Sequence, residues 1–416
     1  RAWMTRSRRK NSPGGGQQRS GTCGFSIPTP LLPDGPEMKT GFTGRRNLRN
    51  RAAGFLILAF SAVWAGSCGR EDVSPPGSAD SVHTAAAAPA RKTFMTVAAV
   101  GDVMLAGSAL PFIERFGPDY PFDSTRTLLQ SADFAIANLE APIGTGGRPF
   151  QKTYTFRVPP GFAGGLRNAG FDVLNLANNH ILDYGVQPFR QTLRILDSLG
   201  IAACGAGMNR RAAEAGAIVV RGGWKAAFLG FSLTYPDAFW ATASRPGTAF
   251  AVKERIAAAI DSLRPAADLV IVSFHWGKEL HRTPQPYQRE FAHAAIDAGA
   301  DFVIGHHPHV LQGFELYRGK PIAYSLGNFA FGSKSVSCRE GALFLASFDS
   351  SGFAGGQVIP LCVDYRKVQY QPRPMTGAAA DRLIAELNRL SEKLNGGVKP
   401  LLPGGEMPAA PSAPTR

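Results

Sequence analysis

The chain has 416 residues and a formal net charge of +14, from 45 Lys and Arg against 31 Asp and Glu. Residues 1–67 hold 11 of the basic and 2 of the acidic residues, which leaves 34 against 29 for the remainder. The length supports one large domain or two average ones. So small an excess of charge forms no basic stripe, which excludes the class of nucleic-acid-binding proteins.

The first part of the chain predicts export. A basic stretch, RRNLRNR, precedes the apolar run AAGFLILAFSAVWAG and then Ser67 and Cys68, which is the order of a secretory signal peptide. The apolar run is shorter than the roughly 20 residues of a membrane-spanning helix. Residues 65–68 resemble a bacterial lipobox, so we expect Cys68 to carry lipid and to anchor the protein to a membrane of the cell envelope. The alternative is an ordinary signal peptide with an incidental cysteine, which keeps the export and loses the anchor.

Composition divides the chain into five parts. We expect residues 1–37 to be an unstructured leader or a misassigned start, 38–67 to be the signal peptide, and 68–92 to be a flexible tether. The folded domain is expected over 93–394, followed by a Pro/Gly-rich tail over 395–416.

Within the expected domain, short apolar runs alternate with segments of helical periodicity, which predicts an α/β fold. Helices are expected over 186–199, 253–263, 286–298 and 378–394. The later runs GALFLASF and GQVIPLCVDY, separated by a Gly-rich turn, predict a β-hairpin.

Five of the apolar runs end in polar residues that are able to bind a metal ion. These residues are Asp102, Glu140, Asn178, Asn179, His180, His275, His306, His307 and His309. In open α/β sheets the ligand crevice lies at the carboxyl ends of the strands, so residues far apart in the chain converge there. Carboxylates together with imidazoles suit divalent transition metals. The alternative is that each polar residue only caps the end of its own strand.

Six motifs, in order over residues 95–333, give the chain a specific resemblance. They are GDVML from 101, NLEAPI from 138, ANNHILDYG from 177, HWGKE from 275, GHHPHV from 305 and YSLGNF from 324. Together they resemble the CapA family of poly-γ-glutamate capsule biosynthesis proteins, which is similar to the calcineurin-like metallophosphatases. The resemblance implies one domain of the α/β (α+β) class, built as a metallophosphatase-like four-layer αββα sandwich.

The same resemblance implies a role for most of these strand-end residues. The implied ligands are Asp102 and His309 for a first metal, Asn179, His275 and His307 for a second, and Glu140 as the bridge between them. His180 corresponds to the histidine beside the substrate, whereas His306 matches no ligand position. The implied cofactor is one or two divalent ions of Mn, Fe or Zn.

The residue types predict how such a site would work. A divalent cation lowers the pKa of bound water from roughly 16 to about 7 and so supplies hydroxide at neutral pH. We expect His180 to donate a proton to the leaving group while Asp183 orients its ring, although Asp183 is equally placed to cap the following helix. Residues expected behind the ligands or against the substrate are Asn178, Trp276, Glu279, His306 and Asn328. For Trp276 the alternative is core packing, for Glu279 it is a solvated charge, and for His306 it is a loop histidine.

The chain departs from the wider metallophosphatase pattern at Met104, where that pattern has a histidine ligand of the first metal. Residues two apart on a strand share a face, so Met104 is expected either to point toward the site or to pack into the core beneath it. A thioether suits Cu(I) better than divalent ions. In either case the first metal position is expected to bind more weakly than the second.

Three functions agree with these residues. The first is a cell-envelope CapA-like hydrolase in the synthesis, processing or export of a poly-γ-glutamate-type polymer, with capsule synthase and export proteins as partners. The second is a secreted metal-dependent phosphoesterase acting on a phosphate ester, and the third is a polymer-binding module without catalysis. The fold does not choose among them.

Overall fold

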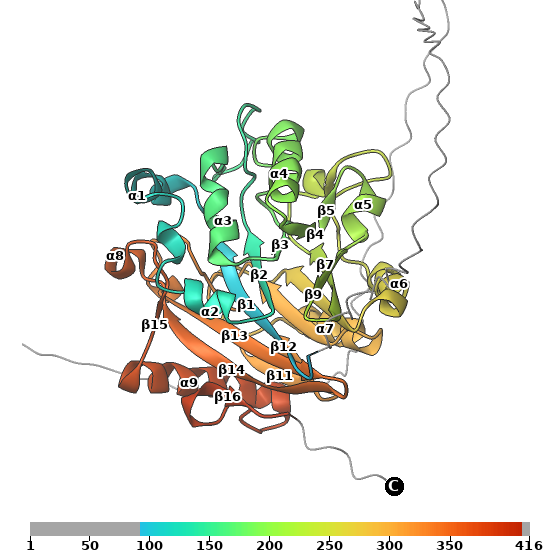
Figure 1. The fold of residues 1–416 in the computed structure, drawn as a ribbon, viewed down its shortest axis with the longest axis vertical. Helices are drawn as coiled ribbons and strands as arrows, with labels where there is room; N and C mark the ends of the chain where they lie inside the picture. The colour runs from blue at the N-terminus through green and yellow to red at the C-terminus, as the bar shows by residue number, and fades with distance from the viewer. Residues whose placement is uncertain (1–91, 410–416) are drawn as a thin grey trace, which may run out of the picture. The chain divides into compact units, whose positions relative to one another are not determined.

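Two β-sheets form the centre of the protein, whose residues 92–409 are described by a computed structural model (Figure 1). The first sheet has the strand order β15-β14-β13-β1-β2-β3-β4, and β16 pairs with β14. Its strands are β1 (Met95–Val103), β2 (Phe134–Leu139), β3 (Val173–Asn175), β4 (Ala202–Cys204), β13 (Glu340–Asp349), β14 (Gly352–Cys362), β15 (Arg373–Pro374) and β16 (Glu406–Met407). Strands β1 to β4 run parallel, so their carboxyl ends lie at one edge.

The second sheet has the strand order β11-β12-β10-β9-β7-β6. Its strands are β6 (Ala217–Arg221), β7 (Trp224–Ser232), β9 (Leu269–His275), β10 (Phe302–His306), β11 (Phe314–Tyr317) and β12 (Lys320–Ala323). Strands β7, β9, β10 and β12 are parallel, and they also end at a common edge. A separate short pair joins β5 (Ala206–Gly207) to β8 (Gly247–Thr248).

Nine α-helices accompany the sheets within residues 92–409. They are α1 (Leu110–Phe116), α2 (Arg126–Gln130), α3 (Gly164–Ala169), α4 (Val186–Ser198), α5 (Arg210–Glu214), α6 (Lys253–Leu263), α7 (Pro286–Asp297), α8 (Tyr365–Val368) and α9 (Gly377–Ser391). Short 3-10 helices span Gly107–Ala109, Tyr120–Phe122, Pro160–Phe162, Asp237–Phe239, Arg264–Ala266, Val336–Cys338, Glu392–Asn395 and Pro403–Gly405. The four helices expected from periodicity correspond to α4, α6, α7 and α9, and the expected hairpin is β13 and β14.

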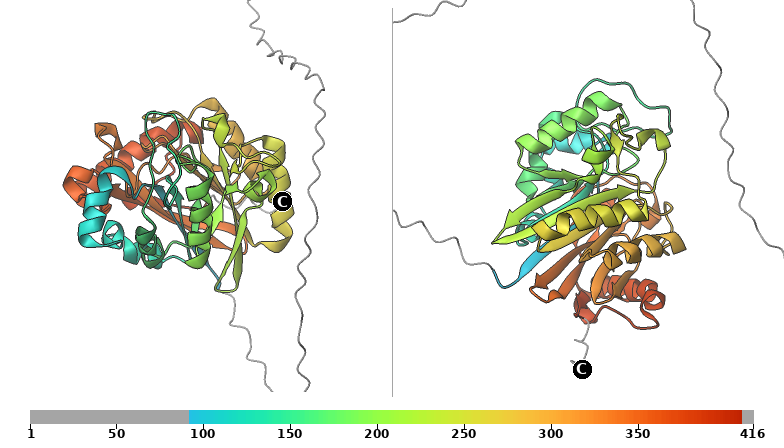
Figure 2. Two further views of the ribbon diagram at one scale, coloured as in Figure 1. Left: turned by 90° about the horizontal axis from the view of Figure 1, so that it is seen from above. Right: turned by 90° about the vertical axis from the view of Figure 1, so that its right-hand side faces the viewer.

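The apolar side chains divide into an inner core and two outer ones. Successive residues of a strand face opposite sides of its sheet. In β1, Val97 faces the other sheet, whereas Ala98 faces the helices α1 to α4. In β9, Ile271 lies in the inner core and Val272 packs toward α6 and α7. The order of layers is therefore helix, sheet, sheet, helix (Figure 2), which confirms the predicted four-layer αββα sandwich.

The ordered domain extends further toward the C-terminus than composition predicted. Part of the expected tail, up to residue 409, packs on the domain: β16 pairs with β14, and the 3-10 helix Pro403–Gly405 precedes it. Leu401 and Met407 are buried in the inner core beside Leu383 and Leu387 of α9. Burial of these two side chains stabilises a segment whose Gly and Pro content resembles that of a linker.

The predicted leader, signal peptide and Cys68 lie outside the described residues. Among residues 92–409, no helix is both long enough and apolar enough to cross a bilayer.

Candidate metal centre

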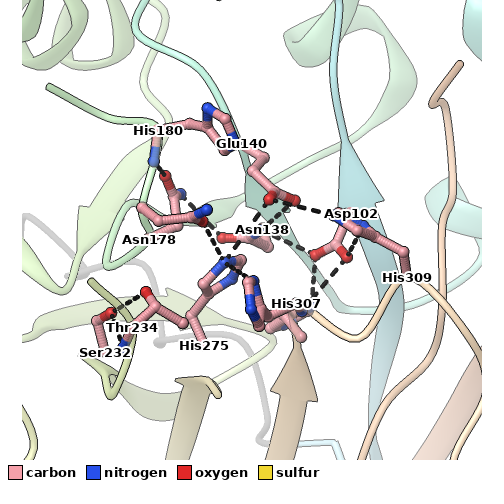
Figure 3. A network of polar contacts seen from close by, with 12 residues as sticks. Asp102, Asn138, Glu140, Asn178, His180, Ser232, Thr234, His275, His307 and His309 are labelled. Carbon is pink, nitrogen blue, oxygen red and sulfur yellow. Dashed lines mark hydrogen bonds and ion pairs between the residues drawn. The ribbon is translucent and has the colours of Figure 1, made fainter. Parts of the chain in front are cut away.

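The carboxyl ends of the parallel strands of both sheets meet, and the candidate ligands meet with them (Figure 3). Two glycines allow this close approach. A Cβ atom on Gly101 would lie 1.8 Å from the carbonyl oxygen of Gly327, and one on Gly305 would lie 1.9 Å from that of Tyr324. Because no larger residue fits at either place, the backbone of both glycines lies directly against the loop after β12. This contact places the Asp102 carboxylate and the His306 imidazole, which follow the two glycines, beside that loop.

The first group of candidate ligands consists of Asp102, Glu140 and His309. The Nδ1 atom of His309 lies 3.1 Å from Asp102 Oδ2, and its Nε2 lies 3.7 Å from Glu140 Oε1. Nδ1 also lies 2.9 Å from Asn328 Oδ1, so Asn328 reaches the site from the loop after β12. Both carboxylates are fully buried.

The second group shares Glu140 with the first and adds His275 and His307. His275 Nε2 lies 3.7 Å from Glu140 Oε1, 3.1 Å from His307 Nδ1 and 2.8 Å from Asn179 Oδ1. The two groups therefore place five of the six implied ligands around one shared carboxylate, Glu140, and the sixth, Asn179, lies beside them through its contact with His275.

Burial and neighbouring charges shift the pKa values of these candidate ligands in different directions. Burial lowers the pKa of His275 well below its usual value and lowers the pKa of His307 to about 3, so both imidazoles are neutral and keep a lone pair for a metal. Although burial opposes it, Glu140 and Asp102 raise the pKa of His309 to about 10. Burial, reinforced by the charge of Asp102, raises the pKa of Glu140 well above its usual value. Metal binding would therefore release a proton from His309.

The unpaired atoms of the site fit a divalent ion. Within residues 92–409, Glu140 Oε1, His275 Nδ1 and both ring nitrogens of His306 are buried without a hydrogen-bond partner. Buried polar atoms of native proteins are rarely left unpaired. A cation would satisfy the shared oxygen of Glu140, and the mixture of carboxylate, amide and imidazole ligands suits Mn, Fe or Zn.

The HHPH sequence gives the loop after β10 an unusual backbone. His307 has a φ of 96° and His309 a φ of 58°, with Pro308 between them. Residues other than glycine rarely adopt positive φ, at a cost of order 1–3 kcal/mol each, and such strain persists mainly at functional sites. The strained loop directs the rings of His307 and His309 to opposite sides of the cluster, one into each ligand group (Figure 3).

Beside the ligands, His180 contacts the buried carboxylate of Asp183, with 2.7 Å between Nδ1 and Oδ2. Asp183 does not cap α4, because the N-cap residue of that helix is Gly185 and no side chain caps it. Burial lowers the pKa of His180, although Asp183 opposes this shift. The structure therefore favours the orienting role of Asp183 over the capping role.

Lys152, which no sequence pattern singled out, joins this pair from the loop before α3. Its Nζ lies 2.6 Å from Asp183 Oδ1 and 3.1 Å from His180 Nδ1, and it also donates to the backbone carbonyl oxygen of Asn179. It also lies over the ring of Phe239, 5.4 Å from the centroid. Lys152 thus links a distant loop to both His180 and a candidate ligand.

Two further predicted residues also lie at the site. His306 is fully buried at the end of β10, with Nδ1 3.5 Å from Asp102 Oδ1, and is therefore not a solvated loop residue. Asn178 donates to the carbonyl oxygen of Leu139 at 2.8 Å and accepts from the backbone N–H of His180 at 3.0 Å, so it holds the loop after β3.

Three further predicted residues form no hydrogen bond to a candidate ligand within residues 92–409. The Trp276 indole donates to the carbonyl oxygen of Tyr324 at 3.0 Å and stacks on Phe274, so it belongs to an outer core rather than to a pocket wall. Glu279 is exposed and, within residues 92–409, forms no hydrogen bond to a histidine, but its charge acts on Glu140 and His309. Met104 is 3% exposed and lies in the core beneath α1 to α4, which is the second of the two positions expected for it.

These features define a class of protein: a four-layer α/β sandwich with a buried carboxylate and histidine cluster, suited to divalent metals, at the ends of its strands. The chain belongs to the bacterial capsule synthesis protein PGA_cap family, whose model matches residues 96–333. This match confirms the family predicted from the six motifs.

Curated relatives extend the match beyond the family model. The chain is 32% identical to the capsule biosynthesis protein CapA of Bacillus anthracis, over 72% of this chain and 74% of the relative. It is 30% identical to the PGA biosynthesis protein CapA of Bacillus subtilis, over 80% and 84%. A solved structure of a hypothetical protein from Thermus thermophilus aligns at 18% identity over 64% of this chain and 98% of its own, with a TM-score of 0.39.

Proposed function

We propose that this chain is a metal-dependent hydrolase of the bacterial cell envelope that acts on an anionic capsule polymer of the poly-γ-glutamate type. Membership of the PGA_cap family and the similarity to two CapA proteins support the polymer class. The observation that carries the metal-dependent activity is the pair of ligand groups that share the buried, unpaired Oε1 of Glu140.

In this proposal each residue has a defined task. Glu140, His275, His307 and Asn179 hold one ion, while Asp102 and His309 with Glu140 hold a second more weakly. A bound divalent ion supplies a Lewis acid and hydroxide at neutral pH. His180 delivers a proton to the leaving amine through the ring nitrogen that does not face Asp183, because Nδ1 is engaged by that carboxylate.

We further propose that the protein is exported and anchored through lipid on Cys68, and that it works beside capsule synthase or export proteins. The order of basic, apolar and small residues before Cys68 supports this. Labelled fatty acid should enter the wild-type protein in a bacterial host and should not enter Cys68→Ala. An intact N-terminus found in the cytoplasm would contradict export.

The activity is tested by loading metal-free protein with Mn, Fe or Zn and offering γ-glutamyl polymers and phosphate esters side by side. We expect cleavage of the γ-glutamyl polymer by wild type and none by Glu140→Gln. Cleavage of phosphate esters alone would replace the proposal with a phosphoesterase. Tight polymer binding without cleavage would replace it with a binding module.

A further inference from the structure

Between the two candidate carboxylates lies one fully buried amide, that of Asn138 in β2. Its Nδ2 donates to Asp102 Oδ1 at 2.8 Å and to Glu140 Oε2 at 3.3 Å. Its Oδ1 accepts from the Nδ2 atoms of Asn178 at 3.1 Å and Asn175 at 3.3 Å. The amide therefore uses both of its donor hydrogens and both of its acceptor lone pairs, the full capacity of an asparagine side chain.

The two amide donors from Asn175 and Asn178 fix which way the Asn138 amide faces. If the amide were flipped, its NH₂ group would face two other NH₂ groups, and its oxygen would face two carboxylates. Both contacts would be repulsive in a site that is closed to water. The three asparagines thus hold the Nδ2 atom of Asn138 toward Asp102 and Glu140.

The Asn138 amide donates to one oxygen of each carboxylate and forms no hydrogen bond with the other oxygen. The remaining oxygen of Asp102, Oδ2, lies 3.1 Å from His309 Nδ1. The remaining oxygen of Glu140, Oε1, has no hydrogen-bond partner within residues 92–409 and lies 3.7 Å from both His275 Nε2 and His309 Nε2. The oxygens that Asn138 leaves face the imidazoles of the two ligand groups, whereas Asp102 Oδ1, which Asn138 contacts, lies 3.5 Å from Nδ1 of His306.

We propose that Asn138 is a positioning residue that assigns one oxygen of each carboxylate to the protein and leaves Asp102 Oδ2 and Glu140 Oε1 for a divalent cation. The inference rests on the proposed metal site and adds the reason for its geometry. A neutral amide that donates to both groups also reduces the repulsion between two buried negative charges. Without these bonds each carboxylate is free to rotate, and the shared oxygen is no longer held between the two histidine groups.

The test compares Mn²⁺ binding by calorimetry in wild type, Asn138→Leu and Asn138→Ser, each prepared free of metal. Leucine keeps the approximate volume and removes the donors, and serine is too short to reach both carboxylates. The matched control is Asn388→Leu, because Asn388 is a buried asparagine of α9 whose amide bonds the backbone of Leu401 and touches no ligand. Circular dichroism shows whether each variant is folded.

We expect both Asn138 variants to weaken Mn²⁺ binding by about 10–100-fold, the range for residues that orient metal ligands. Asn388→Leu should lower the unfolding temperature and keep the wild-type Mn²⁺ affinity. Wild-type affinity in a folded Asn138 variant, or an equal loss in Asn388→Leu, would overturn the inference while leaving the metal site in place. Absence of Mn²⁺ binding by wild type would instead overturn the proposed function.

Discussion

Carboxylates stand at both edges of the sheets, but their partners differ. At the edge where strands begin, Asp133, Asp172 and Asp301 each directly precede a strand. Each accepts a hydrogen bond from a backbone N–H of the neighbouring strand, at 3.0, 3.0 and 2.9 Å, and each also pairs with a Lys or Arg side chain. These carboxylates therefore cap the neighbouring strand through its backbone N–H, and a Lys or Arg side chain neutralises the charge of each.

At the edge where strands end, Asp102 and Glu140 contact an amide and imidazoles instead of a Lys or Arg side chain. Both are fully buried, and Glu140 keeps an oxygen without a hydrogen-bond partner among the described residues. A carboxylate at a strand end is therefore not by itself a sign of function. What separates the two edges is the kind of partner: a Lys or Arg side chain pairs with each carboxylate where strands begin, whereas imidazoles and an amide surround Asp102 and Glu140 where strands end.

The largest difference is expected when one carboxyl at each edge is replaced by an amide. Glu140→Gln should weaken metal binding by about 100-fold or more, beyond the loss typical of residues that only orient ligands, and should not destabilise the metal-free protein. Asp172→Asn should keep the metal affinity and lower the free energy of unfolding by about 1–3 kcal/mol, because an amide has one acceptor oxygen and cannot bind both the Ala135 backbone N–H and the Arg221 guanidinium. Calorimetry and urea unfolding measure the two quantities. A loss of metal affinity in Asp172→Asn, together with a loss of stability but not of affinity in Glu140→Gln, would contradict the roles given to the two edges.

A smaller effect is expected on how the unfolding free energy of the metal-free protein depends on pH. Burial depresses the pKa of His307 from 6.5 to about 3 on folding. Below pH 6.5 the unfolded chain therefore binds a proton that the folded protein does not, so stability falls as the pH falls from 6.5 toward 3. His307→Asn should reduce that slope in urea unfolding experiments performed with chelator. Parallel curves for wild type and variant would contradict the neutral, buried state of His307.

The smallest expected effect is a coupling between Lys152 and Asp183. Lys152→Met leaves the fully buried Asp183 without its cation, whereas Lys152→Met combined with Asp183→Asn leaves no buried charge. The unfolding free energies of wild type, both single variants and the double variant should give a coupling of about 1–2 kcal/mol. Lys278→Met on an exposed loop is the control. Additive losses would mean that the ion pair does not hold the loop of Lys152 in place.

Sequence periodicity was sufficient to predict the long helices, because an amphipathic face repeats several times in α4 or α6. It did not predict α8, which has four residues, or β16, which has two. Such short elements carry only about one period of their pattern, which is too little to recognise, and they depend on contacts made elsewhere in the fold.

The convergence of the candidate ligands was predictable because parallel strands bring their carboxyl ends together. Asn138 could have been found in the same way, because it lies two residues before Glu140 and therefore on the same face. Of the two positions expected for Trp276, the pocket wall was wrong, since this residue follows His275 directly and neighbouring residues of a strand point to opposite faces. No local pattern marks Lys152, because its position depends on contacts with Asp183 and Phe239 that are distant in sequence.

We propose above that the two ligand groups around Glu140 bind divalent metal. Crystals of the metal-free domain soaked in Mn²⁺ and measured at a wavelength with strong Mn anomalous scattering test it directly. We expect an anomalous peak within bonding distance of Glu140, His275 and His307, and a weaker one beside Asp102 and His309. Crystals that show no peak within bonding distance of Glu140, at an Mn²⁺ concentration that labels other sites, would contradict it.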